Sequence, residues 1–136
     1  MRIVIDTNVV ISGVLFGGNP RKVLDYWKMN SYELICSPEI IDEYEDVLYR
    51  MLNKVKNSNS ELVEAFLSLL VKSATLIHPH HNTKLSRDPD DDVFVNCALS
   101  GRALYIVSGD RDLLDIEEVD GIDIITVREF IEILEK

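Results

Sequence analysis

Short runs of branched apolar residues recur along this chain, separated by segments in which apolar positions follow helical spacing. The apolar runs cover residues 3–5, 32–36, 74–77, 104–107 and 122–125. Such runs are typical of strands buried on both faces of a parallel sheet. Because helical segments lie between the runs, the pattern predicts right-handed strand–helix–strand crossovers, with helices on both faces of the sheet.

Polar residues mark where several of these helices should begin. A capping residue followed by proline occurs three times, as Asn19-Pro20, Ser37-Pro38 and Asp88-Pro89. This order favours a helix whose first residue is the proline. Residues 58–61 and 126–129 have the composition of capping boxes, which predicts helices over 60–71 and from residue 127 onward.

Length and composition favour one compact globular unit. The chain has 136 residues, of which 46% are hydrophobic and 28% are charged, so we expect a single domain over residues 1–136. No segment approaches the roughly 20 apolar residues that span a bilayer, and the first residues lack the features of a signal peptide. We therefore expect a cytoplasmic protein with no membrane association.

Neither the cysteines nor the histidines have the spacing of a metal or redox motif. Cys36 and Cys97 lie far apart within apolar runs, which predicts free, buried and unreactive thiols. His78, His80 and His81 share a loop interrupted by proline. Such a loop lacks the rigid presentation that brings histidine ligands together, so a metal site there is disfavoured.

The net charge of −10, from 14 basic and 24 acidic residues, argues against a protein that binds nucleic acid only by neutralising phosphates. If phosphate is the substrate, something else must supply positive charge. A divalent metal held by carboxylates would supply part of it. Local basic patches or a basic partner would have to supply the rest.

Acidic residues occur where a parallel sheet would bring them to one edge. Asp6 ends the first apolar run, Glu43 lies on the helix after the second, and residues 90–92 open another helix. Asp110 and Asp112 follow the fourth run. Open α/β sheets bind ligands at the carboxyl ends of their strands, and carboxylate oxygens select Mg²⁺ or Mn²⁺. The pattern therefore predicts metal-assisted phosphoryl chemistry.

Each acidic position also has a simpler, structural explanation. Asp6 could form an ordinary polar turn with Thr7 and Asn8, and Asp88 could serve only as a helix cap. Glu43 could be a solvated acid on the helix surface, like Asp42 and Glu45. The recurrence of acids after successive strands is what favours a functional site.

Four ordered motifs resemble those of PIN-domain proteins, in the bacterial and archaeal branch that includes toxins of toxin–antitoxin pairs. The motifs are Ile5-Asp6-Thr7-Asn8, the helix from Ser37-Pro38 through Glu43 to Leu48, the segment Arg87-Asp88-Pro89-Asp90-Asp91-Asp92, and Ser108-Gly109-Asp110-Arg111-Asp112-Leu113-Leu114. The resemblance covers essentially the whole chain. It implies a three-layer α/β/α sandwich with a five-stranded parallel sheet of order 3-2-1-4-5, and a metal-dependent ribonuclease that leaves a 5′-phosphate.

The resemblance also implies roles for individual residues. An acidic quartet that binds one or two Mg²⁺ or Mn²⁺ ions would consist of Asp6, Glu43, Asp92 and Asp110. Asp91 competes with Asp92 for the third place, and Asp112 is a further candidate. Asp92 is preferred because it heads the helical face that carries apolar residues, whereas Asp91 lies nearer the cap. Thr7 or Asn8 is expected to orient Asp6, and Ser108 is a further orienting residue.

Basic residues that could contact an RNA substrate are few. Arg87 and Lys84, beside the acidic run, and Arg21 and Lys22, on the first long helix, are the candidates. Scattered solubilising charge is the plainer explanation for each of them. The helix expected over 60–71 is apolar around most of its circumference, which favours a homodimer. A cognate antitoxin is a partner implied by the family alone.

Two other functions are consistent with the same residues. A PIN-like binding module that does not cleave RNA would tolerate neutralisation of Asp6 or Asp110. A phosphatase could use Asp6 as its nucleophile, but such enzymes usually have a second aspartate two residues later, where this chain has Asn8. The phosphatase is therefore the less favoured of the two alternatives.

Overall fold

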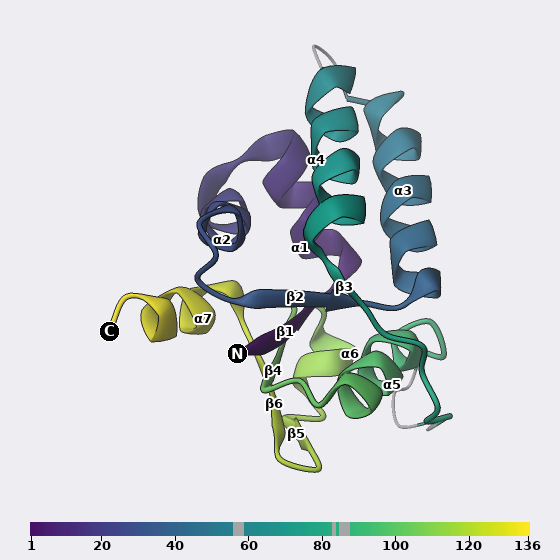
Figure 1. The fold of residues 1–136 in the computed structure, drawn as a ribbon, viewed down its shortest axis with the longest axis vertical. Helices are drawn as coiled ribbons and strands as arrows, with labels where there is room; N and C mark the ends of the chain where they lie inside the picture. The colour runs from purple at the N-terminus through teal and green to yellow at the C-terminus, as the bar shows by residue number, and fades with distance from the viewer. Residues whose placement is uncertain (56–58, 83, 85–87) are drawn as a thin grey trace.

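The computed structural model describes residues 1–55, 59–82, 84 and 88–136, and its centre is a sheet of six strands (Figure 1). The strand order across the sheet is β3-β2-β1-β4-β6-β5. The strands are β1 (Arg2–Ile5), β2 (Glu33–Cys36), β3 (Thr75–Leu76), β4 (Tyr105–Val107), β5 (Glu118–Val119) and β6 (Ile122–Ile125). Every neighbouring pair is parallel except β5 and β6, which are antiparallel.

The prediction of five parallel strands was therefore wrong in one respect. The five expected strands are present as β3, β2, β1, β4 and β6, in the expected spatial order. The sixth strand, β5, is added by a tight hairpin that makes the sheet mixed. Gly121 closes this hairpin with a φ of 85°, and its N–H donates to the Glu118 carboxylate at 2.9 Å. A two-residue strand gives no recognisable apolar run, which is why the sequence did not reveal it.

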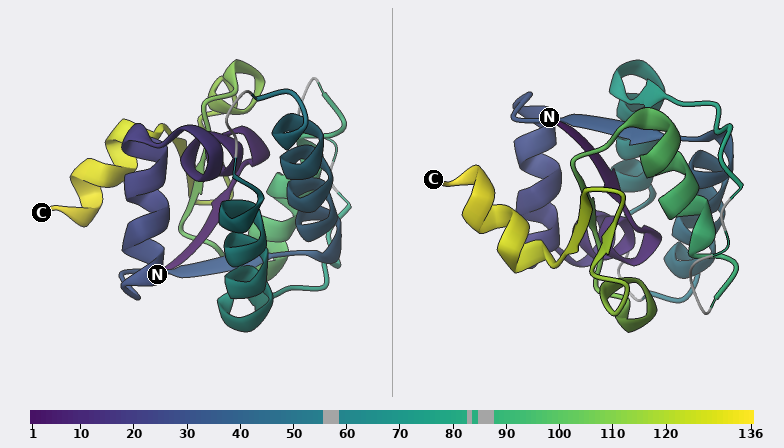
Figure 2. Two further views of the ribbon diagram at one scale, coloured as in Figure 1. Left: turned by 90° about the horizontal axis from the view of Figure 1, so that it is seen from above. Right: turned by 90° about the horizontal axis from the view of Figure 1, so that it is seen from below.

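Helices cover the sheet on both sides, as the pattern predicts. In Figure 1 helices α1 to α4, with η1, lie above β2, and α5 and α6 lie on the other side, beside β4 and β6. Figure 2 shows α7 beside α2, with which it is in contact. The helices are α1 (Thr7–Ile11), the π-helix η1 (Ser12–Phe16), α2 (Gly18–Lys28), α3 (Pro38–Leu52), α4 (Ser60–Ser73), α5 (Asp92–Gly101), α6 (Arg111–Leu114) and α7 (Val127–Leu134). No described helix is both long enough and apolar enough to cross a membrane.

Two of the predicted helix starts are confirmed. Ser37 caps α3 by accepting a hydrogen bond from the Ile40 N–H at 3.3 Å, and Pro38 is the first residue of that helix. Thr126 and Glu129 form the expected capping box of α7. These caps place the helices directly after β2 and β6.

The other predicted helix starts differ in detail. Helix α2 begins at Gly18 and not at Pro20, because Gly17 and Gly18 take positive φ values, 95° and 68°, that turn the chain before Asn19. Asn59 caps α4 through the Glu61 N–H, whereas Ser58 lies outside the described residues. Helix α5 begins at Asp92 and is preceded by a turn from residue 88.

The core joins α3 to the end of β1. Tyr44 is fully buried, and its hydroxyl donates to the carbonyl oxygen of Ile5, the residue before Asp6. The ring of Phe66, on α4, packs edge-on against Tyr44 at 6.5 Å between centroids. Cys36 and Cys97 are free and buried, as predicted. This packing fixes α3 beside the edge of the sheet where the acidic residues lie.

Candidate metal centre

Asp6 is a buried carboxylate at the carboxyl end of β1, with 4% of its surface exposed. It caps α1, since its Oδ1 accepts a hydrogen bond from the Val9 N–H at 3.0 Å. Its Oδ2 accepts a hydrogen bond from the Ser108 hydroxyl. Burial raises the pKa of Asp6, the charge of Asp110 acts in the same direction, and hydrogen bonds from Ser108, Val9 and Gly109 oppose the rise.

Ser108 links Asp6 to the loop after β4. Ser108 is completely buried and follows Val107, which lies opposite Ile5 in the sheet register. Its hydroxyl oxygen also accepts a hydrogen bond from the Asp110 N–H at 2.9 Å. One side chain therefore contacts both Asp6 and Asp110, and the orienting role of Ser108 stays a prediction.

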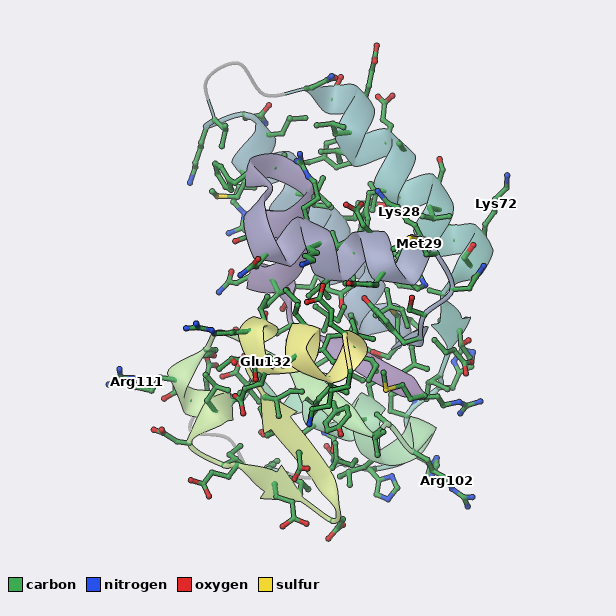
Figure 3. The ribbon with its side chains drawn as sticks, turned by 90° about the vertical axis from the view of Figure 1, so that its left-hand side faces the viewer. Lys28, Met29, Lys72, Arg102, Arg111 and Glu132 are labelled. Carbon is green, nitrogen blue, oxygen red and sulfur yellow. The ribbon has the colours of Figure 1, made fainter. Side chains whose placement is uncertain are left out.

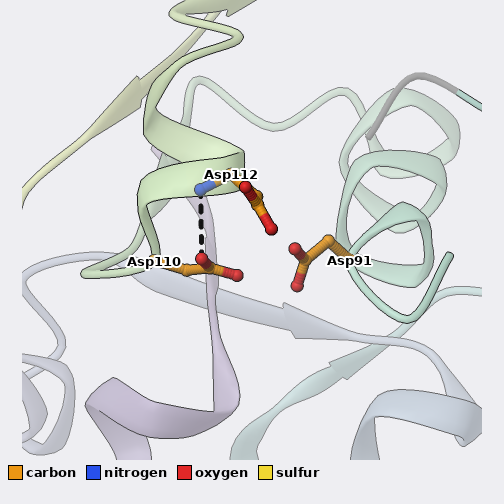
Figure 4. Close-up of side chains that lie close together, drawn as sticks. All are labelled: Asp91, Asp110 and Asp112. Carbon is orange, nitrogen blue, oxygen red and sulfur yellow. Dashed lines mark hydrogen bonds between the residues drawn. The ribbon is translucent and has the colours of Figure 1, made fainter. Parts of the chain in front are cut away.

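Three carboxylates converge beside this link. Asp110 caps α6 by accepting a hydrogen bond from the Asp112 N–H at 3.1 Å. Asp91 approaches both from the turn before α5 (Figure 4). One oxygen from each of Asp91, Asp110 and Asp112 lies within 4.8 Å of the others. A cation would relieve the repulsion between these like charges, and three carboxylate oxygens match the hard ligands that Mg²⁺ and Mn²⁺ prefer.

The structure brings Asp91 into this group, where the sequence favoured Asp92. Because α5 begins at Asp92 and not at Pro89, Asp91 lies on the preceding turn and its side chain points toward Asp110 and Asp112 (Figure 4). Asp92 is buried, with 8% of its surface exposed, and is not part of the triad. Among the described residues, no histidine joins a potential metal group either.

Glu43 is held by a residue that was expected to orient Asp6. The Thr7 hydroxyl donates a hydrogen bond to Oε2 of Glu43, so Thr7 fixes Glu43 and not Asp6. Glu43 is half-buried, whereas Asn8 is exposed. Glu43 therefore approaches the end of β1 from α3, but it lies outside the close triad of Asp91, Asp110 and Asp112.

Two of the four basic residues that were expected to contact RNA interact with other parts of the chain. Arg21 donates to the carbonyl oxygens of Gly13 and Val14, at 2.8 and 2.9 Å, and so ends η1. Lys22 forms an ion pair with Glu135 at 2.7 Å, next to the C-terminus. Lys84 is exposed, and Arg87 lies outside the described residues.

Arg111 is a candidate that the sequence reasoning did not consider. It is exposed, and its side chain projects outward from the molecule (Figure 3). In the sequence it stands between two members of the triad, Asp110 and Asp112. Its place inside the acidic motif after the fourth strand was the available signal. A cation at this position could contact a phosphate that approaches the carboxylates.

Comparison with known proteins is consistent with this geometry. The sequence model of a family described as PIN domain matches residues 2–112. An uncharacterized protein of Methanocaldococcus jannaschii, MJ1680, is 31% identical over 149 aligned positions, which cover 100% of this chain and 93% of that protein. The crystal structure of PAE2754 from Pyrobaculum aerophilum superimposes with a TM-score of 0.68 at 15% identity, over 99% of this chain and 90% of that one.

Proposed function

Because the chain belongs to the PIN domain family, we propose that it is a Mg²⁺- or Mn²⁺-dependent endoribonuclease. PIN domains are generally nuclease-like and usually bind a divalent metal. The observation that carries the proposal is the convergence of Asp91, Asp110 and Asp112 beside the buried Asp6. A structural role alone would need a cap at Asp110 but not three facing carboxylates.

In the proposed mechanism the metal ligands come from both sides of the sheet edge. Asp91, Asp110 and Asp112 would hold one or two ions, and Asp6 lies close by with its two oxygens fixed by Ser108 and Val9. A bound Mg²⁺ or Mn²⁺ would polarise the phosphate and lower the pKa of a water molecule. Desolvation of Asp6 makes a nearby cation more favourable than it would be in bulk water.

Glu43 completes the proposed site from α3. Its carboxylate is fixed by Thr7, directly after Asp6, so it can accept a proton or bind metal-coordinated water without first losing side-chain freedom. Glu43→Gln should lower the cleavage rate in Mg²⁺ by about 100-fold. Glu45→Gln, on the exposed side of the same helix, is the matched control and should leave the rate unchanged. Equal rates in the two variants would remove Glu43 from the site.

The cellular role that we propose is that of the toxin in a toxin–antitoxin pair. The support is the resemblance of all four motifs to that branch of the family. We also propose a cytoplasmic location, an antitoxin partner, and a homodimer that uses the side of α4 carrying Leu62, a leucine with 45% of its surface exposed. Sedimentation at micromolar concentration tests the dimer, because a monomer at every concentration would contradict it.

Cleavage of a labelled RNA pool by the purified chain is the decisive experiment. Cutting should require Mg²⁺ or Mn²⁺, stop in EDTA, and be lost in Asp110→Asn. Asp90→Asn, an exposed neighbour of the triad, is the control and should cut normally. A folded wild type that binds metal but leaves RNA intact would favour the non-catalytic binding module.

Expression in cells tests the toxin role separately from the chemistry. Induction of the wild type should arrest growth, and induction of Asp110→Asn at the same protein level should not. Growth arrest by both variants would mean that RNA cleavage is not the cause. Active nuclease without growth arrest would leave the enzyme proposal standing and remove the toxin.

A further inference from the structure

A second surface, which is partly apolar and so differs from the acidic triad, lies between α3 and α4. The two helices stand side by side above the sheet (Figure 1). A shallow, open groove of about 480 Å³ lies between them. Its lining residues come from both helices, at spacings that place each set on one face: Glu45, Tyr49, Glu64, Leu67, Ser68 and Val71.

This shallow α3–α4 groove exposes apolar side chains. Val71 has 79% of its surface exposed and Tyr49 has 41%, and both rank among the most exposed large hydrophobic residues of the chain. Leu67 lies one helical turn before Val71 and is half-buried. Single exposed apolar residues are ordinary, but several in one groove are typical of a binding surface.

The rim of the groove is strongly acidic. Glu45 and Glu64 face it from opposite helices, and an adjoining hollow on α3 adds Asp42 and Asp46. Among the described residues that line the two hollows, Arg50 is the one basic side chain, and it is paired with Asp46 at 2.9 Å. Exposed apolar side chains flanked by acidic side chains on both helices therefore have the pattern complementary to a basic amphipathic helix.

We propose that the α3–α4 groove is the docking site for a lysine- or arginine-rich amphipathic segment of a partner protein. Apolar side chains of that segment would contact Tyr49 and Val71, and its basic side chains would face Glu45 and Glu64. RNA does not fit, because the rim carboxylates repel phosphates. A second copy of this chain is disfavoured, because each copy carries a net charge of −10 and offers no excess of basic side chains to face Glu45 and Glu64.

A synthetic helical peptide provides the probe. It has 16 residues with leucine on one face and lysine on both flanks, and a scrambled peptide of identical composition controls for charge alone. Fluorescence anisotropy at physiological salt should show binding of the amphipathic peptide about tenfold tighter than the scrambled one. Amide chemical shifts of the wild type should move at Tyr49, Glu64 and Val71 on binding.

Charge reversal then locates the site. Glu64→Lys should weaken binding about fivefold, the loss expected for one exposed ion pair and a new repulsion. Glu132→Lys, an exposed acid on α7 with the same change in net charge, should weaken it less than twofold. Val71→Asp should abolish the preference for the amphipathic peptide.

Three results would overturn the proposal. The first is equal affinity for the two peptides, or no binding of either, because the groove would then contribute no affinity beyond the attraction due to the net charge of the chain. The second is an equal loss in Glu64→Lys and Glu132→Lys. The third is conversion of a dimer to a monomer by Val71→Asp, which would make this surface a contact between copies of the chain.

Discussion

Asp91→Asn tests the metal centre through protein stability, without any assumption about the substrate. In the absence of metal, the Asp91 carboxylate lies within 4.8 Å of oxygens from Asp110 and Asp112. At that distance two unit charges repel each other by about 1 kcal/mol in water and about 3.5 kcal/mol at the effective dielectric constant of a protein surface. Removing Asp91 deletes two such repulsions, and for partly exposed carboxylates we take the value in water, so the fold should be stabilised in EDTA by about 1–2 kcal/mol.

The expected shift in melting temperature follows from the length of the chain. An unfolding entropy of about 2.1 cal/mol/K per residue converts 1–2 kcal/mol into a rise of about 3–7 °C for 136 residues. Saturating Mg²⁺ should stabilise the wild type more than Asp91→Asn. At 100 times its dissociation constant the ion would stabilise the wild type by about 2.7 kcal/mol, and the variant by less.

Thermal melts in EDTA and in a Mg²⁺ series measure both effects, and Asp90→Asn is the matched control. Asp90 is exposed on the same turn, outside the triad, so its replacement should shift the melting temperature by less than about 2 °C in either condition. If Asp91→Asn behaved like Asp90→Asn, the triad would be no more than a group of solvated acids. If Asp92→Asn alone lost the Mg²⁺ effect, Asp92 would be the ligand.

Three further results are expected. Tyr44→Phe should lower the free energy of unfolding by about 1–3 kcal/mol in urea melts, because the buried Ile5 carbonyl loses its donor. The control Tyr49→Phe, at an exposed tyrosine, should change it by less than about 0.5 kcal/mol. In EDTA the stability of the wild type relative to Asp6→Asn should fall as the pH rises from 3.8 to the higher pKa that burial gives Asp6, because the native state retains that proton longer; parallel pH profiles of the two proteins would contradict this. Cys36 and Cys97 should react with a thiol reagent only after unfolding, because burial raises both pKa values, that of Cys97 to about 12; rapid labelling of the native protein would show that they are accessible.

The strands were predictable because their signal is local and repeated. Residues 3–5 are entirely buried, and the carboxyl ends of β1 and β4 lie side by side, as alternating strands and helices require. That arrangement alone brings Asp6 and Asp110 to one edge of the sheet. The motif spacing therefore predicted that these two carboxylates meet at one edge of the sheet.

Helix starts were less predictable, and the start of α5 decides which aspartate lies beside Asp110 and Asp112. Asp88, Asp91 and Asp92 are all plausible caps, and the sequence cannot rank them because each satisfies the same local preference. The structure uses residues 88–91 as a turn, closed by a hydrogen bond from the Asp91 N–H to the Asp88 carbonyl at 3.0 Å. Successive helical side chains point about 100° apart, so this shift exchanges Asp92 for Asp91.

Contacts between distant residues were the remaining unknown. Ser108 bonds to Asp6 across 102 positions, and Thr7 bonds to Glu43 across 36. No pattern within either segment specifies its partner. The family resemblance implied that Thr7 orients Asp6, but its hydroxyl, at the start of a helix in contact with α3, donates to Glu43.

The two outermost strands of the sheet, β3 and β5, have only two residues each. A longer exposed edge would present a row of unpaired amides and carbonyls on which other chains can add strands and aggregate. Here one edge ends after Thr75–Leu76, and the other after a hairpin flanked by Glu117, Glu118 and Asp120. The sheet is therefore closed to edge-to-edge growth on both sides, and we expect the chain to remain dispersed at concentrations at which a flat parallel sheet would form fibrils.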